Sequence, residues 1–339
     1  MTPAPLLGAS LSSPPPDFPP RVAAQALAQH YGLTGTLTAL TSERDVNYKL
    51  TTTGGDFVVK LANPAEPAEV TRLQTRALIH LEASNLPVPH VIRTLQGAPD
   101  VALPQGILRV LTYLEGSLMH RAAPSPALRS AVGDMAARLS RGLQGFGDPA
   151  AGHVLQWDIK QAAALRPMLP DVPADLRGAG QATLDRFDRD IAPQLPNLRW
   201  QVVHNDLNPH NILTGPTGET VTGILDFGDM VRTPLVCDLA VAASYLIDAA
   251  QPMTSLIQVA AAYHAVLPLL HAEAALLIAL TQTRFVTTLC ITGHRAKRYP
   301  ENAPYILRNV QRSRAGLLAL GALDQGGAVQ SLLTALRLP

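Results

Sequence analysis

Two different periods of hydrophobic and polar residues run along this chain, and the change of period separates a β-rich first third from a mainly helical remainder. Residues 47–53 and 56–61 alternate as strands do, and Gly54-Gly55 between them predicts a tight hairpin with positive φ at both glycines. Apolar positions three and four residues apart predict helices elsewhere. The other elements predicted in the first third are helices over residues 22–30 and 66–82 and a strand over residues 106–113.

From residue 127 onward the apolar spacing is helical, and prolines separate the segments. Helices are predicted over residues 127–143, 159–165, 174–191, 236–250, 257–266, 271–298 and 305–320. Two short strands, 211–214 and 222–225, interrupt them, joined by a Gly-Pro-Thr-Gly turn. The pattern predicts an α+β, bilobed fold with a cleft between its lobes. We expect a proline-rich flexible tail over residues 1–20, a β-rich N-terminal lobe over 21–114 and a helical C-terminal lobe over 115–339.

The composition narrows the classes of partner. The chain of 339 residues has 27 basic and 26 acidic side chains, so no global field attracts nucleic acid or an anionic membrane. Its two cysteines, Cys237 and Cys290, are too few for a disulfide framework and suit a reducing compartment. Residues 1–20 have seven prolines and no basic residue, unlike a secretory signal, and polar residues interrupt the apolar stretch 257–280. We expect a soluble, cytoplasmic protein with neither nucleic acid nor membrane as a partner.

The densest polar signal lies at residues 204–211, between apolar runs that read as strands. His204, Asp206 and Asn211 have the spacing His-x-Asp-x-x-x-x-Asn, and Asp226-Phe227-Gly228 follows after a short hairpin. A loop framed in this way holds its side chains in place at the edge of a core. The two motifs in this order are typical of phosphoryl transfer from a nucleotide.

The chemistry of that reaction suggests a role for each residue type. Phosphoryl transfer needs a positioned hydroxyl and cations that neutralise the phosphate oxygens. Asp206 can accept the proton of an acceptor hydroxyl, and Asn211 and Asp226 offer the oxygen ligands that Mg²⁺ prefers. Lys60, at the end of the hairpin, would reach the α- and β-phosphates. His204 more simply packs against the loop and hydrogen-bonds it.

On these residues the chain resembles the aminoglycoside phosphotransferase and choline kinase family of small-molecule kinases, which share the protein-kinase-like fold. The likeness covers residues 21–320 and is greatest to the hydroxylysine kinase branch, which also occurs fused ahead of class III aminotransferases. The stretches that carry it are 41–48, 58–61, 109–114, 157–158, 204–211 and 238–240. The resemblance implies these roles: Asp206 as catalytic base, Asn211 and Asp226 as metal ligands, Lys60 on the phosphates, and backbone groups of Thr112, Tyr113 and Leu114 on the purine.

The N-terminal lobe departs from protein kinases at two places. The phosphate loop over residues 41–45 contains no glycine, so it would use backbone N–H groups and hydroxyls such as that of Ser42. The position of the glutamate that pairs with the lysine falls nearest Gln74, with Glu69 as the other candidate partner of Lys60. Hydroxylysine kinases use GTP, so the resemblance leaves ATP and GTP both open as the donor.

The acceptor is expected to be small, because only residues 229–233 separate Asp226-Phe227-Gly228 from Pro234 and the next helix. This leaves no activation segment on which a peptide could lie. Arg284, on an otherwise apolar helix face, either binds a substrate carboxylate or bridges helices inside the lobe. The other candidate contacts to the acceptor, through its amine, are Asp158, Asp229 and Tyr245.

Three hypotheses about function remain open from the sequence. The first is a Mg²⁺-dependent kinase for an amino alcohol or a hydroxylysine-like amino acid; aminoglycoside, homoserine, choline and ethanolamine are alternative acceptors, with choline disfavoured by an aromatic content of 4%. The second is a catalytically idle nucleotide-binding protein. The third is a phosphohydrolase that binds its metal through His204, Asp206 and His210.

Overall fold

The computed structural model describes residues 13–42 and 45–339, which form two compact units. The first unit comprises Met1–Glu115, Asp148–His153 and Gly223–Gly228, and the second comprises Gly116–Gly147, Val154–Thr222 and Asp229–Pro339. Glu43 and Arg44, in the expected phosphate loop, lie outside the described residues. Each unit has its own arrangement of strands and helices and is described separately below.

The first unit contains a six-stranded sheet in the order β1-β2-β3-β6-β4, with β5 also paired to β6. Its strands are β1 (Thr36–Leu40), β2 (Val46–Thr52), β3 (Gly55–Leu61), β4 (Val91–Ile92), β5 (Val101–Leu103) and β6 (Gly106–Thr112). The hairpin of β2 and β3 is present, but its turn differs from the prediction. Thr52 pairs with Gly55, so the loop is Thr53 and Gly54, and only Gly55 has a positive φ, 130°.

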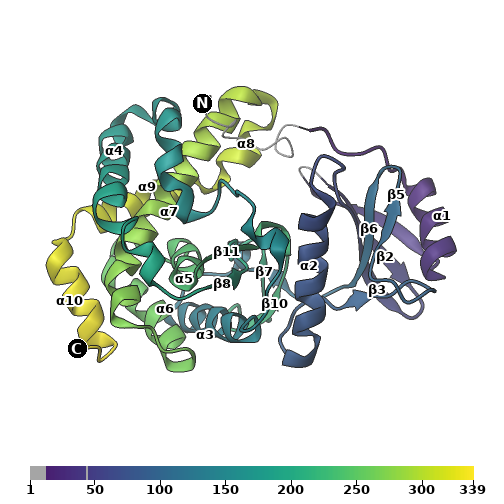
Figure 1. Cartoon of the computed structure of the whole chain (residues 1–339), viewed down its shortest axis with the longest axis horizontal. Helices are drawn as coiled ribbons and strands as arrows, with labels where there is room; N and C mark the ends of the chain where they lie inside the picture. Colours follow the sequence, from purple (N-terminus) through teal and green to yellow (C-terminus); the bar gives the residue numbers. More distant parts are fainter. Residues whose placement is uncertain (1–12, 43–44) are drawn as a thin grey trace. The chain divides into compact units, whose positions relative to one another are not determined.

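Two helices, α1 (Pro20–Tyr31) and α2 (Ala68–Leu81), cover opposite faces of this sheet (Figure 1). The alternation along β3 and β6 decides which side chain meets which helix. Val59 and Leu61 point to the cluster that contains Leu27 of α1, whereas Lys60 and its cross-strand neighbour Arg109 point to the opposite face. The register of β3 therefore directs Lys60 away from the α1 core.

The predicted tail does not extend as far as residue 20. Phe18 is 2% exposed, lies in the core cluster with α1, and accepts a hydrogen bond at its carbonyl from Tyr48 Oη at 2.6 Å. Pro14 accepts another from Asn63 Nδ2 at 2.8 Å. The prediction was wrong here because proline richness indicates an extended backbone but says nothing about a phenylalanine that packs beside it.

The second unit is mainly helical (Figure 1). Its α-helices are α3 (Pro126–Gly142), α4 (Arg177–Arg186), α5 (Leu235–Ser244), α6 (Pro252–Val266), α7 (His271–Arg298), α8 (Ala303–Ile306), α9 (Val310–Gly321) and α10 (Gln325–Ala335). Its short strands are β7 (Ser117–Leu118), β8 (Trp200–Val203), β9 (Ile212–Thr214), β11 (Val231–Pro234) and the first half of β10 (Val221–Ile224). They form a sheet in the order β10-β9-β7 and an antiparallel pair of β8 with β11.

Helix α7 is the central element of this unit. It packs against α4, α5, α9 and α10, and its length and apolar composition alone would suit a membrane span. In the structure, however, 94% of its most apolar window is buried by the rest of the fold, as in the core helix of a soluble protein. Glu273 fixes its beginning: Oε2 accepts from the N–H of Leu270 at 2.9 Å and from Arg199 Nη2 at 2.5 Å.

Four helical segments differ from the prediction. The segment predicted over 174–191 is divided between the 3₁₀ helix η6 (Ala174–Leu176), α4 and the π-helix η7 (Phe187–Ile191). The segment predicted over 159–165 is the 3₁₀ helix η5 (Ile159–Asp171), which contains Pro167 and Pro170, residues without an N–H donor. The helix predicted over 236–250 ends at Ser244. The segment predicted over 305–320 is divided between α8, the 3₁₀ helix η11 (Leu307–Asn309) and α9.

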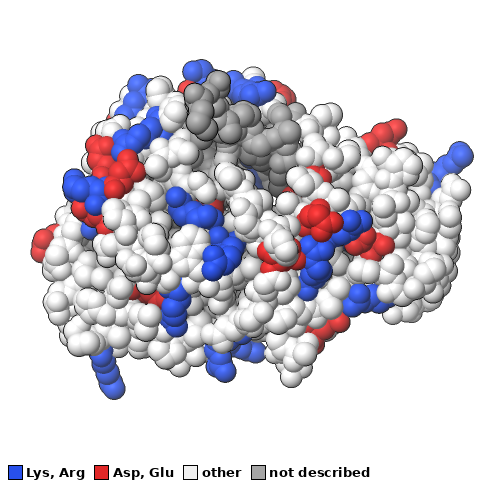
Figure 2. All heavy atoms as spheres, viewed as in Figure 1, with Lys and Arg blue, Asp and Glu red and all other residues white. Residues whose placement is uncertain are grey.

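Charged side chains are mixed in sign on the surface. On the face shown in Figure 2, Lys and Arg lie among Asp and Glu, as the net charge of +1 leads one to expect. Any anionic ligand therefore has to be bound by local groups rather than gathered by a large one-signed field.

Candidate active site

The polar loop over residues 204–211 joins β8 to β9 in the second unit. It folds back on itself, because the N–H of Asn208 donates to the carbonyl of Asp206 at 2.8 Å and the N–H of Asn211 donates to that of Asn208 at 3.0 Å. Asn205 has a φ of 64°, in the left-handed region that asparagine tolerates better than most residues. We call this segment the Asp206 loop.

Asp206 is held in one orientation by its own loop. Its Oδ2 accepts from Asn208 Nδ2 and from Asn211 Nδ2, both at 2.8 Å, and its N–H donates to His204 Nδ1 at 3.2 Å. The side chain nevertheless remains 22% exposed. The result is a carboxylate with a fixed orientation and a route to solvent.

Arg284 of α7 lies beside the other oxygen of this carboxylate. Its Nη2 is 3.5 Å from Asp206 Oδ1 and 3.4 Å from Tyr245 Oη, while Nη1 donates to the carbonyl of Trp157 at 2.7 Å. Burial lowers the pKa of Arg284, but Tyr245, Asp206 and Asp229 together raise that pKa by more, so the guanidinium stays charged. Arg284 is only 1% exposed, and its contacts connect α7 to Trp157, to Tyr245 and to the Asp206 loop.

A buried carboxylate fixes the loop from behind. Asp238, in the first turn of α5, accepts from the N–H of Asn205 at 2.7 Å. Burial raises the pKa of Asp238, and the neighbouring His204 and the N–H of Asn205 partly oppose that rise. The left-handed turn at Asn205 is thus tied to the start of a core helix.

In the first unit, Lys60 pairs with Asp226. Lys60 Nζ lies 3.3 Å from Asp226 Oδ1, and the Asp226 side chain is 54% exposed. Asp226 has a φ of 53°, and its Oδ1 also accepts from the N–H of Gly228 at 3.3 Å. A cation and a carboxylate with an open side are therefore held together at the start of Asp226-Phe227-Gly228.

The two side chains of α2 expected as partners of Lys60, Gln74 and Glu69, pair with other residues. Gln74 is buried and accepts at Oε1 from Arg109 Nη2 at 2.9 Å. Glu69 is exposed and pairs with Arg72 at 3.0 Å. The register places Arg109 next to Lys60 on the same face, so the buried arginine takes the amide acceptor on α2 and Asp226 takes the lysine.

The backbone groups expected at the purine differ in availability. The N–H of Thr112 donates to the carbonyl of His90 at 2.9 Å, and the N–H of Tyr113 donates to that of Asp56 at 3.1 Å. Leu114 follows them with a half-buried side chain, and within the described part of the chain its N–H has no hydrogen-bond partner. Ser42, the expected phosphate-loop hydroxyl, is half-buried directly before the undescribed residues 43–44.

The three remaining candidates for the acceptor contact have different surroundings. Asp158 is fully buried: Oδ1 accepts from Thr233 Oγ1 at 2.9 Å and from the N–H of Lys160, whose Nζ bonds Oδ2. It caps η5 and has no open side for a substrate, contrary to the expectation. Tyr245 contacts Arg284, and Asp229 adds to the negative charge around the same guanidinium.

The histidines of the loop do not form the ligand set that the phosphohydrolase hypothesis requires. His204 is buried and accepts the N–H of Asp206, while the ring of His210 stacks on His120 with centroids 4.3 Å apart. Burial, Arg308 and His120 lower the pKa of His210 to about 4. Among the residues that the structure describes, no group of three His, Cys, Asp or Glu side chains could hold a metal.

Two residues that hold the site escaped the sequence reasoning. Asn208 both orients Asp206 and accepts the N–H of His210 at 2.7 Å, and Arg109 is buried between β6 and α2. The spacing Asp-x-Asn-Pro in a tight loop is a signal for such an Asx turn. Nothing comparable marks Arg109, whose surroundings depend on strand register.

Comparison with known proteins agrees with this geometry. The phosphotransferase enzyme family (APH) matches residues 36–277. A hydroxylysine kinase of Danio rerio is 31% identical over 319 residues, covering 88% of this chain and 89% of its own length. A microcompartment-associated aminopropanol kinase has a TM-score of 0.69 at 18% identity, covering 91% and 98% of the two chains. An amicoumacin kinase, solved in complex with AMP-PNP, Ca²⁺ and Ami, has a TM-score of 0.68 at 15% identity, covering 91% and 96%.

These likenesses confirm the α+β, protein-kinase-like fold expected from the sequence and the resemblance to small-molecule kinases. The family match spans all strands of the sheet of the first unit and the Asp206 loop. The chain therefore belongs to the phosphotransferase enzyme family and is a small-molecule kinase.

Proposed function

We propose that this protein transfers the γ-phosphoryl group of ATP or GTP to the hydroxyl of an amino alcohol or a hydroxylysine-like amino acid, with Asp206 as the base. The observation that carries this proposal is the orientation of Asp206. Two side-chain amides, from Asn208 and Asn211, fix one carboxylate oxygen at 2.8 Å while the side chain stays partly exposed. A base must meet the hydroxyl in a defined direction, and this arrangement supplies that direction.

In the proposed reaction Asp206 hydrogen-bonds the acceptor hydroxyl and takes its proton as the new P–O bond forms. The bond between the γ-phosphorus and the bridging oxygen of the nucleotide breaks at the same time, and the nucleoside diphosphate leaves. Transfer of this kind needs positioning and charge neutralisation more than covalent help from the protein. Arg284, 3.5 Å from Oδ1, keeps positive charge beside the carboxylate. We propose that Arg284 positions Asp206 rather than touching the acceptor.

We propose Mg²⁺ as the metal, held by Asn211 and Asp226 with the phosphates of the nucleotide. The donor chemistry fits: Asn211 spends its amide nitrogen on Asp206, which leaves its oxygen for a cation, and Asp226 presents a partly exposed carboxylate. Oxygen ligands of this type are those that Mg²⁺ prefers. When bound, Mg²⁺ would neutralise phosphate oxygens as charge develops in the transition state.

Lys60 and Leu114 are proposed to bind the nucleotide. Lys60 is the cation of the first unit that already pairs with the carboxylate of Asp226. For the purine we propose the N–H of Leu114, because the N–H groups of Thr112 and Tyr113 are committed to the carbonyls of His90 and Asp56. Ser42 stays in the proposal as a hydroxyl of the phosphate loop, and Gln74 stays in it as the acceptor that holds Arg109.

The acceptor class rests on likeness to the hydroxylysine kinase of Danio rerio. Homoserine, ethanolamine, choline and aminoglycosides are the other acceptors to be compared. We also propose a cytoplasmic location, which the two buried cysteines without a disulfide suit.

A coupled nucleotide-consumption screen tests the proposal. Hydroxylysine, homoserine, ethanolamine, choline and an aminoglycoside are each supplied with ATP and with GTP, using wild-type protein and Asp206→Asn. We expect one of the amino-acid or amino-alcohol acceptors to stimulate consumption, and the variant to lose that stimulation. Thermal stabilisation by nucleotide without acceptor-dependent consumption would instead favour the idle nucleotide-binding protein.

A further inference from the structure

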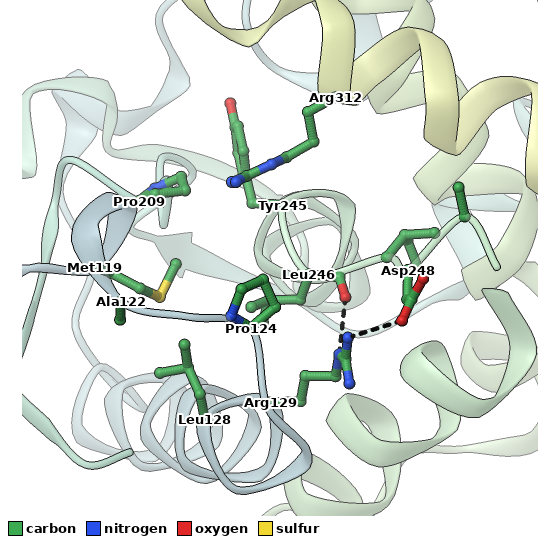
Figure 3. Close-up of a pocket in the computed structure, with 12 residues that line it drawn as sticks. Met119, Ala122, Pro124, Leu128, Arg129, Pro209, Tyr245, Leu246, Asp248 and Arg312 are labelled. Atoms are coloured by element: carbon green, nitrogen blue, oxygen red, sulfur yellow. Dashed lines mark hydrogen bonds and ion pairs between the residues drawn. The ribbon is translucent and has the colours of Figure 1, made fainter. Parts of the chain in front are cut away.

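A cavity of about 250 Å³ lies in the second unit, next to the Asp206 loop. Pro209 of that loop and Tyr245, which contacts Arg284, both line it (Figure 3). Asp206 and Tyr245 meet the same nitrogen of Arg284, at 3.5 and 3.4 Å. Tyr245 in the cavity wall is thus connected to the proposed base through the guanidinium of Arg284.

The size of the cavity favours a small ligand. Pockets that enclose drug-sized molecules measure about 300–1,000 Å³. A cavity of about 250 Å³ falls below that range, which suits a molecule as large as an amino acid better than an aminoglycoside of several rings. Met119 and Leu128 give it an apolar wall against which methylene groups can pack.

The arginines at this cavity differ in whether a carboxylate already neutralises their charge. Arg129 donates to the carbonyl of Leu246 at 3.1 Å and pairs with Asp248 at 3.5 Å, on one side of the cavity (Figure 3). Arg284, which contacts Tyr245, is paired with the carboxylate of Asp206. Arg312 lines the other side and, within the part of the chain that the structure describes, has neither a hydrogen-bond acceptor nor a carboxylate partner.

Arg312 extends from α9 toward Tyr245 and Pro209 (Figure 3). A guanidinium keeps its charge at any physiological pH and offers a planar fork of donors that matches a carboxylate. Since the Arg312 side chain is exposed, water can reach it, and a carboxylate that replaces this water gains charge-assisted hydrogen bonds. An unpaired arginine beside a cavity of this size is the feature expected of an anchor for a small acid.

We propose that this cavity binds the acceptor, that the acceptor carries a carboxylate, and that Arg312 binds that carboxylate. The inference rests on the proposed kinase function and narrows it from amino alcohols in general to amino acids. The sequence suggested Arg284 as the residue that binds a substrate carboxylate. We assign this role to Arg312 instead, because Arg284 is buried and already bonded.

Matched acceptors test this inference. Hydroxylysine and homoserine are each compared with the amino alcohol that lacks only the carboxylate, using wild-type protein and Arg312→Gln. We expect wild type to prefer the carboxylated member of a pair, and Arg312→Gln to lower its kcat/KM by about 10- to 100-fold, as loss of a charge-assisted hydrogen bond implies. Turnover of the decarboxylated member should stay within about 2-fold.

Arg308→Gln is the matched control variant. Arg308 is an exposed arginine four residues before Arg312, and its Cζ lies 3.8 Å from the centre of the Tyr305 ring. It does not line the cavity. The Arg308→Gln variant removes the same charge from the same region. Because Arg308 does not line the cavity, this variant should leave the preference for the carboxylated acceptor intact. An equal loss in both variants would overturn the anchor role of Arg312, as would an equal loss for both members of a pair.

Calorimetric binding of the same compounds separates this inference from the proposed function. If wild type binds the carboxylated acceptors and Arg312→Gln does not, yet no phosphate is transferred, the anchor stands and the kinase proposal fails. If phosphate is transferred with no preference for a carboxylate, the kinase proposal stands and the anchor fails. Wild type that neither binds nor turns over any carboxylated acceptor also overturns the anchor.

Discussion

Gly316 lies on α9 where this helix packs against α7, and the contact leaves no room for a methyl group. A Cβ on Gly316 would lie 2.7 Å from Phe285 Cε2 and 2.8 Å from Cε1, and closer still to Cζ. Phe285 is 1% exposed on α7, so its ring cannot turn into solvent to make room. Gly316→Ala is therefore expected to push α9 and α7 apart.

The size of the effect follows from two opposing contributions. Forcing an extra methyl group into a packed core costs about 1–3 kcal/mol. Alanine is favoured over glycine inside a helix by about 1 kcal/mol. Since the clash is with an enclosed ring, we expect the first contribution to exceed the second and the variant to be destabilised by up to about 2 kcal/mol. For a domain of 150–250 residues each kcal/mol corresponds to about 2–4 °C in Tm.

Gly321→Ala is the matched control, because Gly321 ends the same helix and a Cβ there would meet no heavy atom within 4 Å. Urea and thermal denaturation of the two variants, followed by circular dichroism, provide the comparison. We expect Gly316→Ala to unfold earlier than wild type and Gly321→Ala to match or exceed it. Equal stability of the two variants would refute the packing argument. Because α9 also carries Arg312, Gly316→Ala should in addition weaken any preference for a carboxylated acceptor.

Further predictions concern buried charges and the metal. Glu273→Ala should lower the free energy of unfolding by about 3 kcal/mol. This is the low end of the cost of breaking a buried ion pair, because the partner Arg199 is about a third exposed. A loss of under about 1 kcal/mol in urea denaturation would contradict this expectation. Asp158→Ala should lower stability by about 1–3 kcal/mol with no change in the KM of the acceptor, since Thr233 and the N–H of Lys160 lose their acceptor; a raised KM with intact stability would show a substrate contact instead. Chelation of divalent cations should abolish phosphate transfer and added Mg²⁺ should restore it, and unaffected turnover would remove the metal from the proposal.

Local patterns in the sequence were sufficient for elements whose causes are local. The spacing over residues 271–298 predicts α7 with both of its ends, because a long apolar stripe with a buried capping glutamate has few alternatives. The hairpin of β2 and β3 is also predicted. Its turn is shifted by one residue, since strand pairing at Thr52 and Gly55 decides which residues form the loop.

The residues of the Asp206 loop were predictable as a set, whereas their partners were not. Spacing along one loop places Asp206 and Asn211 within reach of each other. The pairing of Lys60 with Asp226, and of Gln74 with Arg109, depends on strand register and on segments far apart in sequence. Such contacts are fixed only when the sheet and its helix have formed.

Helix faces show a similar limit. The stripe on α7 identifies Arg284 as unusual, but only the packing of Trp157, Tyr245 and Asp206 around it shows that the guanidinium is enclosed. Arg312 received no prediction at all, because nothing in the sequence distinguishes it from Arg308 and Arg314 in the same predicted helix. Its position in the cavity becomes visible only in three dimensions.

Direct detection of the phosphorylated acceptor tests the central claim, that Asp206 is the base of a small-molecule kinase. Wild-type protein and Asp206→Asn are incubated with nucleotide labelled at the γ-phosphate and the acceptor that stimulates consumption most, and the product is identified by mass spectrometry. The account predicts label on the acceptor hydroxyl and a rate about 10²–10⁴-fold lower in the variant, as for loss of a general base, with nucleotide binding unchanged. Label released to water, or a variant within a few-fold of wild type, would contradict it.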